Sequence, residues 1–250
     1  MKTKHEEFEE EVAENIAELG RDEELQERSR EWIDGIASHK YTYNFSWLGR
    51  PIIQLPQDIV AMQELIWSIQ PDLIVETGIA HGGSIIFYAS MLELNASCGG
   101  PQDAEVLGVD IDIRDHNREA IESHPMFGRI SMIQGSSTAS EIVEQVKAKA
   151  EGKQRVLVCL DSNHTHDHVL AELEAYAPLT SLGSYCVVMD TVVEDMHESM
   201  FADRPWGVGD NPKTAVWEYL KTHPEFEIDK SIDHKLLISV APDGYLKRVK

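Results

Sequence analysis

Residues 73–84 read LIVETGIAHGGS, and this stretch predicts how the rest of the chain is organised. Residues 73–77 form an apolar, largely β-branched run that carries one carboxylate, which is typical of a buried strand. A loop with three glycines follows, and Ser84 is a suitable N-cap for the helical pattern after it. The stretch therefore predicts a strand, a tight turn and a helix whose first N–H groups face a ligand above the strand end.

The glycine spacing in this loop argues against a dinucleotide site. The three glycines do not form the G-x-G-x-x-G fingerprint of dinucleotide-binding turns. A glutamate shortly before the first glycine is instead a pattern typical of sites for S-adenosylmethionine (SAM). The predicted SAM contacts in this stretch are Glu76, Gly78, Gly82 and Ser84. The alternative is an ordinary strand-to-helix turn of an α/β protein.

The composition excludes several classes of partner. The chain has 250 residues, with 44 acidic against 22 basic side chains and a formal net charge of −22. Such a surface repels phosphate backbones and anionic membranes, so we expect neither nucleic acid nor a membrane as a partner. No apolar run reaches the roughly 18 residues of a membrane helix, and the acidic N-terminus does not resemble a signal peptide. Three cysteines without a C-x-x-C pair fit a reducing compartment, and we expect a cytoplasmic protein.

Apolar runs alternate with helical patterns along most of the chain. Strands are predicted at residues 73–77, 105–110, 130–134, 155–161, 185–190, 226–228 and 236–240. Helices are predicted at residues 56–69, 84–94, 116–122, 139–150, 166–176 and 214–223. Alternating strands and helices imply βαβ units, so we predict an α/β fold with a doubly wound, mostly parallel, seven-stranded Rossmann-like sheet.

Two amphipathic helices precede this alternating pattern. Apolar residues recur at helical spacing between residues 8 and 19, and a second helix follows the break at residues 20–22. We predict a helical extension over residues 1–45 and an α/β domain over residues 46–250. The extension would be a solvated surface, a cap over the site or an oligomer contact.

An aromatic stretch separates the extension from the α/β domain. Residues 41–51 show no periodicity, which predicts a loop. Within it, Trp47 and Arg50 would lie beside a substrate or would simply pack.

Acidic residues stand at the last or next-to-last position of four predicted strands, namely Glu76, Asp110, Asp161 and Asp190. Ligands in an open α/β sheet bind beyond the carboxyl ends of the strands, so these four predict an acidic crevice, although any one alone fits a turn or a helix cap. Asp110 is suited to accept hydrogen bonds from both hydroxyls of a ribose. Gln134 and Ser136, at the end of the next strand, would reach an adenine edge.

Residues 161–168 read DSNHTHDH and form a second dense cluster. Asp161 and Asp190 are suited to hold Mg²⁺, which prefers oxygen ligands. His164 is placed to take a proton from a substrate hydroxyl at neutral pH. A zinc cluster of His164, His166 and His168 is disfavoured, because alternate residues share neither a strand face nor a helix face. For His166 and His168, polar residues at a helix start are the simpler interpretation.

Several of these motifs resemble one known family. They are LDSNHT at residues 160–165, HVL at 168–170, EL at 172–173, Tyr176, Pro178, GSYCVVMDT at 183–191, PDLIVETG at 71–78, NPK at 211–213 and FEID at 226–229. Together they are similar to the cephalosporin hydroxylase / rhamnosyl O-methyltransferase family, from about Trp47 to the end of the chain. The resemblance implies a class I SAM-dependent methyltransferase fold. It also implies relatives that use Mg²⁺ to position a sugar diol and a histidine as base.

The resemblance assigns roles to individual residues. Glu76 and Gly78 would line the SAM pocket, Asp110 would bind the ribose, Asp161 and Asp190 would bind metal, and His164 would be the base. We also place Asp161 among the SAM contacts and the catalytic residues. The relatives carry an acid just before the residue that matches Asp190, where this chain has Met189. A thioether is a poor ligand for Mg²⁺, so the site would bind metal weakly, use Glu194, Asp195 or the substrate instead, or work without metal.

The sequence therefore predicts a SAM-dependent O-methyltransferase that acts on a hydroxyl of a sugar or small natural product, in a homo-oligomer. Residues 203–209, DRPWGVG, would form a substrate lid or a structural loop with a buried tryptophan. Two other functions stay open. One is a hydroxylase-associated partner enzyme, although the sequence shows no convincing iron triad. The other is a SAM-binding subunit without turnover.

Overall fold

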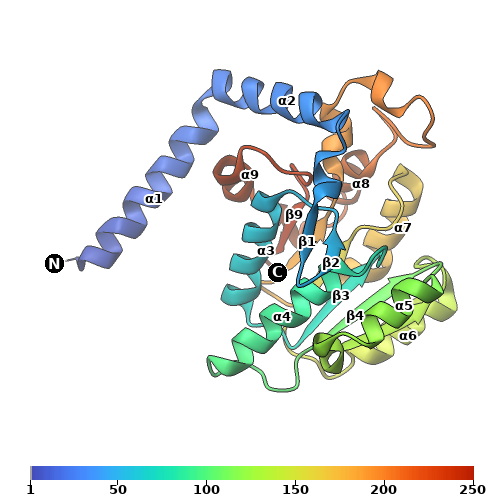
Figure 1. Cartoon of the computed structure of the whole chain (residues 1–250). Helices are drawn as coiled ribbons and strands as arrows, with labels where there is room; N and C mark the ends of the chain where they lie inside the picture. The colour runs from blue at the N-terminus through green and yellow to red at the C-terminus, as the bar shows by residue number, and fades with distance from the viewer. Residues whose placement is uncertain (1) are drawn as a thin grey trace.

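A seven-stranded mixed sheet forms the centre of the computed structural model, which describes residues 2–250 (Figure 1). Its strands are β3 (Leu73–Thr77), β4 (Glu105–Asp110), β5 (Ile130–Gln134), β6 (Val156–Leu160), β7 (Tyr185–Val188), β8 (Phe226–Ile228) and β9 (Tyr245–Arg248). Their spatial order is β5-β4-β3-β6-β7-β9-β8. The first five strands are parallel, and β9 runs antiparallel to both β7 and β8. The predicted α/β fold with a mostly parallel sheet is confirmed.

The strand order reverses beside β3. The chain enters the sheet at β3, proceeds outward to β4 and β5, and returns to β6 on the other side of β3. In register, Glu76 lies between Gly108 of β4 and Cys159 of β6. Ligands of open α/β sheets bind at such a reversal, beyond the carboxyl ends of the strands. The topology therefore places the candidate site above β3 and β6.

Helices cover both faces of this sheet, and each face has its own apolar core. The helices are α3 (Pro56–Ile69), α4 (Gly83–Ser97), α5 (Asp115–Glu122), α6 (Ser140–Ala150), α7 (His166–Tyr176), α8 (Pro212–Tyr219) and α9 (Lys230–Leu236). Met62 of α3 and Phe87 of α4 pack on one face with Ile74 of β3. Val75, the next residue of β3, packs on the other face with Leu173 of α7. This alternation is the two-residue period of a strand buried on both sides.

The aromatic stretch before α3 is more ordered than the predicted loop. It contains a 3₁₀ turn, η1 (Tyr41–Asn44), and a hairpin of β1 (Phe45–Trp47) and β2 (Arg50–Ile52). Leu48 and Gly49 both have positive φ, as a two-residue hairpin turn requires. Strands of three residues are too short to show a two-residue period in the sequence, which explains the error.

Trp47 and Arg50 both make contacts within the protein. The Trp47 ring lies edge-on to Phe87, and its Nε1 donates to Ser90 Oγ at 2.9 Å. Arg50 donates to the backbone oxygen of His81 and to Asn117 Oδ1. These contacts fix the hairpin against α4 and the turn that follows β3.

The strand predicted at residues 236–240 is wrong. Residues 230–236 form α9 instead, and the last strand of the sheet is β9. Asp229 caps α9 by accepting from Ser231 N at 3.1 Å. Residues 239 and 240 then bond to Asp58 of α3, which accepts from Ser239 Oγ at 2.6 Å and from Val240 N at 2.9 Å. This buried acid, distant in sequence, holds the apolar run outside the sheet.

Two helices precede the sheet, α1 (Lys4–Arg21) and α2 (Glu23–Ala37). Thr3 and Glu6 form a capping box at the start of α1. No residue of α1 is buried, and the helix extends away from the sheet, with contacts to α9 and α2 (Figure 1). Within residues 2–250, no helix combines the length and the apolar content that a membrane crossing requires.

Candidate active site

The turn after β3 allows two loops to approach closely. Gly78 has φ 92°, and a Cβ at this position would lie 1.9 Å from the carbonyl oxygen of Asp161, which follows β6. Gly82 has φ 81° and is the N-cap residue of α4. The prediction that Ser84 is the N-cap is therefore wrong, because its Oγ donates to Glu76 Oε2 at 2.8 Å instead. The glycines bring the β3 turn and the β6 turn together at the reversal of strand order.

We expect Gly78→Ala to lower the free energy of unfolding more than Gly152→Ala does. Both glycines have left-handed φ, 92° and 80°, so each alanine costs about 1 kcal/mol in backbone strain. Only at Gly78 does the added Cβ collide with backbone, since no described atom lies within 4 Å of a Cβ at Gly152. Urea denaturation of both variants measures the difference. Equal losses would contradict the close approach of the two turns.

Glu76 is a fully buried carboxyl at the end of β3. Its Oε2 accepts from Ser84, whereas Oε1 has no hydrogen-bond partner within residues 2–250. Burial raises the pKa of Glu76 to about 8, with the negative charge of Asp110 adding to the effect. The carboxyl is therefore neutral at pH 7 and can ionise when a cationic group approaches.

Asp110 fixes the glycine turn through its carboxylate. Oδ2 accepts from Ile79 N at 2.8 Å and from Ala80 N at 3.1 Å, and Oδ1 accepts from Asp112 N at 2.9 Å. A carboxylate has about four acceptor positions, so the side chain can still accept from a ligand. The structure thus gives Asp110 a second role, in ordering the turn, that the sequence did not indicate.

Asp110 also lines a pocket of about 160 Å³, which we call the nucleoside pocket after the ligand that the sequence predicts for Asp110. Its lining residues are Gly78, Val109, Asp110, Ile111, Ser136, Ser137, Ser162, Asn163 and His168. The predicted contact Ser136 is thus at this pocket. Gln134 is exposed, does not line it, and accepts from Arg118 at 3.0 Å. Gln134 does not reach the pocket because its side chain points from the end of β5 to Arg118 of α5 and not over the carboxyl ends of the strands.

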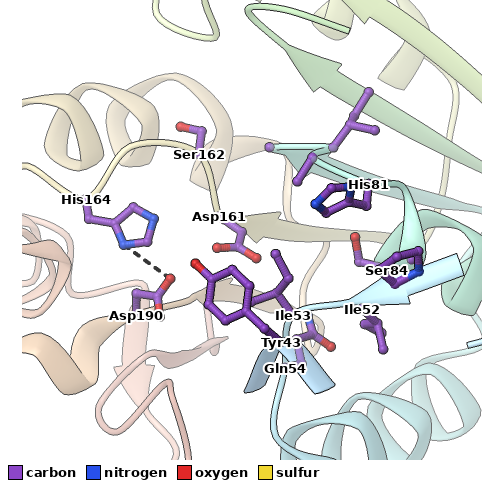
Figure 2. A pocket seen from close by; sticks show the side chains of 15 residues that line it. Tyr43, Ile52, Ile53, Gln54, His81, Ser84, Asp161, Ser162, His164 and Asp190 are labelled. Carbon is purple, nitrogen blue, oxygen red and sulfur yellow. Dashed lines mark ion pairs between the residues drawn. The ribbon is translucent and has the colours of Figure 1, made fainter. Parts of the chain in front are cut away.

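A second pocket, the triad pocket, holds about 200 Å³ and contains the acidic cluster (Figure 2). One ligand atom from each of Asp161, His164 and Asp190 lies within 4.8 Å of the others. His164 Nδ1 is 3.2 Å from Asp190 Oδ2. Desolvation and the charge of Asp190 hold the pKa of Asp161 well above its ordinary value. A bound cation would relieve this repulsion, and the two carboxylates are oxygen donors that fit Mg²⁺ with open positions for water or substrate.

Met189 does not take part in this cluster. Its side chain is 2% exposed and packs in the core with Val187. The two acids considered as substitutes have other partners, since Glu194 accepts from Asn211 Nδ2 and Asp195 pairs with Lys213 at 2.5 Å. His164 is therefore the third group beside Asp161 and Asp190 in the described part of the chain.

The loop over His164 carries an aromatic side chain. The Trp206 ring stacks on the His164 ring at a centroid distance of 4.8 Å and an interplanar angle of 21°. Trp206 is half-buried, and whether residues 203–209 form a substrate lid or a structural loop stays open. The stack covers one face of the imidazole and restricts how the ring can turn.

The other two histidines of the cluster have partners elsewhere. The ring of His166 bonds to Thr214 Oγ1 at 2.8 Å. His168 Nε2 lies 3.1 Å from Ser137 Oγ and 3.2 Å from Ser162 Oγ. His166 begins α7, which agrees with its interpretation as a polar residue at a helix start. His168 faces the nucleoside pocket, which the sequence did not indicate.

Tyr43 and Gln54 are among the lining residues of the triad pocket that the sequence did not indicate. Tyr43 comes from η1, and Gln54 lies between β2 and α3 (Figure 2). Neither residue belongs to a recognisable motif. The one feature of the sequence that could have pointed to them is a polar group within an otherwise aromatic or apolar stretch. The two pockets meet at Gly78 and Ser162, which line both. An elongated ligand can therefore extend from one pocket into the other.

Comparisons with known proteins place the chain in a family. The family model of rhamnosyl O-methyltransferase/CmcI matches residues 39–249. The rhamnosyl O-methyltransferase of Mycobacterium leprae is 31% identical over 225 residues, which cover 86% of this chain and 91% of the relative. The protein of the same name from Mycobacterium tuberculosis H37Rv is 30% identical over 221 residues, covering 84% of this chain and 83% of the relative.

Solved structures share the fold. One named "cmcI-D160 Mg-SAM" has a TM-score of 0.58 and 19% identity, covering 83% of this chain and 78% of that one. An O-methyltransferase from Bacillus cereus in complex with S-adenosylhomocysteine (SAH) has a TM-score of 0.52 and 16% identity, covering 82% of each chain. The predicted class I methyltransferase fold is confirmed. With the strand-end acids, the glycine turn and the family match in place, the chain belongs to the rhamnosyl O-methyltransferase/CmcI family of SAM-dependent O-methyltransferases.

Proposed function

We propose that this protein transfers the methyl group of SAM to a hydroxyl of a sugar or small natural product, with Mg²⁺ at Asp161 and Asp190 and with His164 as base. The observation that carries the proposal is the cluster of Asp161, His164 and Asp190 in a pocket that continues into the nucleoside pocket. The names of the mycobacterial relatives support a sugar acceptor. One of the similar structures is named for Mg and SAM together.

The two pockets divide the reactants between them. The ribose would lie at Asp110 and the base of the nucleoside beside Ser136, while the sulfonium end passes Gly78 into the triad pocket. The acceptor hydroxyl would lie at the triad. Methyl transfer needs the attacking oxygen, the methyl carbon and the leaving sulfur in line, so positioning by these walls contributes much of the rate.

His164 is oriented for proton abstraction. If Nδ1–H is donated to Asp190 Oδ2, at 3.2 Å, the lone pair of the ring lies on Nε2. Asp190 retains its other oxygen for the cation. Mg²⁺ bound to the two aspartates would orient the acceptor hydroxyl and lower its pKa. The hydroxyl proton passes to His164 Nε2 as the oxygen bonds to the methyl carbon and the carbon–sulfur bond breaks, which gives a methyl ether and SAH.

We expect SAH to bind the wild-type protein in the micromolar range and to bind Asp110→Ala at least tenfold more weakly. The variant loses the ribose acceptor and the bonds that order the glycine turn. Calorimetric titration with and without Mg²⁺ measures both effects, and Asp103→Ala, which removes an exposed acid, is the matched control. If the wild-type protein binds no SAH in either condition, the proposed function is wrong.

SAH binding without turnover on any hydroxyl-bearing acceptor would instead favour a cofactor-binding subunit. Methylation that proceeds equally well in excess chelator would remove Mg²⁺ from the proposal and leave SAM and His164. Chemistry that requires iron and oxygen would favour the hydroxylase-associated enzyme.

We also propose that residues 1–45 act as a cap or an oligomer contact of a homo-oligomer. Tyr43, near the end of this segment, lines the triad pocket, whereas α1 leaves its apolar residues exposed or half-buried. Size-exclusion chromatography with light scattering tests the assembly, and a particle of 28.2 kDa would contradict it. A cytoplasmic location and the absence of nucleic-acid and membrane partners stay predictions.

A further inference from the structure

Gln54 has a buried side chain that is short of hydrogen bonds. It is 1% exposed, and neither Nε2 nor Oε1 has a hydrogen-bond partner within 3.5 Å in residues 2–250; the hydroxyl of Tyr88, a polar neighbour of the amide, donates to Cys159 Sγ instead. Figure 2 shows Gln54 on the lower wall of the triad pocket, between Ser84 and the acidic cluster. A buried amide without partners is costly, and a methionine of similar shape would fill the same space at lower cost. The position of Gln54 on a pocket wall indicates that a ligand supplies the partners.

The surroundings of Gln54 narrow the chemistry of that ligand. Gly83 and Ser84 also line the pocket, and they belong to the first turn of α4, whose N-cap Gly82 offers no side-chain cap. The uncapped N–H groups of this 15-residue helix favour an anion. Glu76 does not line the pocket, but it lies behind Ser84, which donates to its Oε2, and its Oε1 has no partner among the described residues. The wall thus offers N–H groups to an anion and has behind it a carboxyl that favours a cation.

A zwitterion matches this arrangement, and the cofactor carries one. SAM has an α-ammonium and an α-carboxylate at the end opposite its adenine. If the adenosine occupies the nucleoside pocket, this end passes Gly78 and enters the triad pocket. The triad itself is taken by the acceptor hydroxyl and the cation, which leaves the wall of Gln54 and α4 for the amino-acid group.

We infer that Gln54 binds the α-amino-acid end of SAM, with Oε1 accepting from the α-ammonium and Nε2 donating to the α-carboxylate. This inference rests on the proposed function and adds to it the residue that holds one end of the cofactor. The contacts involve charged partners in a desolvated site, where hydrogen bonds are strongest. Gln54 therefore acts as a binding residue that fixes the sulfonium relative to the triad.

The test compares two ligands on two variants. SAH carries the amino-acid group, whereas 5′-methylthioadenosine has the same adenosine and a sulfur but lacks that group. Calorimetry measures both ligands with the wild type, with Gln54→Met, and with Gln154→Met, an exposed glutamine, as the control. We expect Gln54→Met to bind SAH at least tenfold more weakly, to bind methylthioadenosine with unchanged affinity, and to melt at a higher temperature than the wild type without ligand. Gln154→Met should match the wild type throughout.

The outcomes separate this inference from the proposed function. If the wild type binds both ligands and Gln54→Met weakens both equally, or weakens neither, Gln54 does not contact the amino-acid end. If Gln54→Met weakens only Mg²⁺ binding, the amide serves the cation instead and the inference is wrong. If the wild type binds neither ligand, the proposed function fails as well. Gln54→Glu is a second variant, whose carboxylate still accepts from the α-ammonium but repels the α-carboxylate. We expect it to weaken the binding of SAH and to leave the binding of methylthioadenosine unchanged.

Discussion

His164→Ala should lower kcat for methyl transfer by about 10²- to 10⁴-fold, because a positioned general base contributes a factor of this size. The geometry gives the ring three constraints that an alanine cannot replace. Asp190 lies 3.2 Å from Nδ1, Trp206 stacks on one face, and Asp161 lies within the same cluster. SAH binding should change by less than threefold, because the contacts proposed for SAH are those of the nucleoside pocket and of Gln54, and none of them involves His164.

His166→Ala is the matched control for this prediction. It removes an imidazole two residues away whose ring bonds to Thr214 on α8 rather than to the acidic cluster. We expect this variant to keep its kcat within a few-fold of the wild type. Steady-state rates of both variants, with added imidazole as a rescue for His164→Ala, decide between a base and a structural residue. Comparable rates for His164→Ala and the wild type would exclude His164 as the base.

Glu76→Gln should make the protein more stable than the wild type at pH 8 and above. The free energy of unfolding of the variant minus that of the wild type should be roughly 3 to 5 kcal/mol larger there than at pH 4.5. In the folded protein, burial raises the pKa of Glu76 from 4.5 to about 8. Between these values the unfolded chain has lost this proton and the folded chain still binds it. The unfolded state then binds fewer protons, so the free energy of unfolding falls as the pH rises through this window. Glutamine does not titrate, so the free energy of unfolding of the variant does not fall in this way as the pH rises.

The measurement is urea denaturation of both proteins at several values of pH from 4.5 to 9. Asp58 and Asp233 also have raised pKa values, each about 6, but their contributions are common to both proteins and cancel in the difference. Asp58→Asn is the control, and its difference from the wild type should level off near pH 6 rather than pH 8. A difference between Glu76→Gln and the wild type that is constant with pH would show that Glu76 is already ionised when folded.

The sequence determined the parallel part of the sheet and the edge at which the site lies. The strands at residues 73–77, 105–110 and 130–134 and the helices at residues 56–69 and 166–176 match the structure residue for residue. Each of these elements is set by local sequence pattern. A buried parallel strand needs a continuous apolar run, and a helix needs apolar residues that recur at about every 3.6 positions. Parallel strands also bring their carboxyl ends to one edge, so acids at those ends were expected to lie together.

Only the tertiary structure decided which side chains meet at that edge. The bond of Ser84 to Glu76, the contact of His164 with Asp190 and the stack of Trp206 on His164 join residues from different segments of the chain. Local pattern carries no information about such pairs, since a side chain turns to the partner that folding brings near. The same holds for the amide of Gln54, which the sequence shows as one polar residue among apolar neighbours. Burial beside the pocket leaves that amide without partners and so makes it a candidate ligand contact.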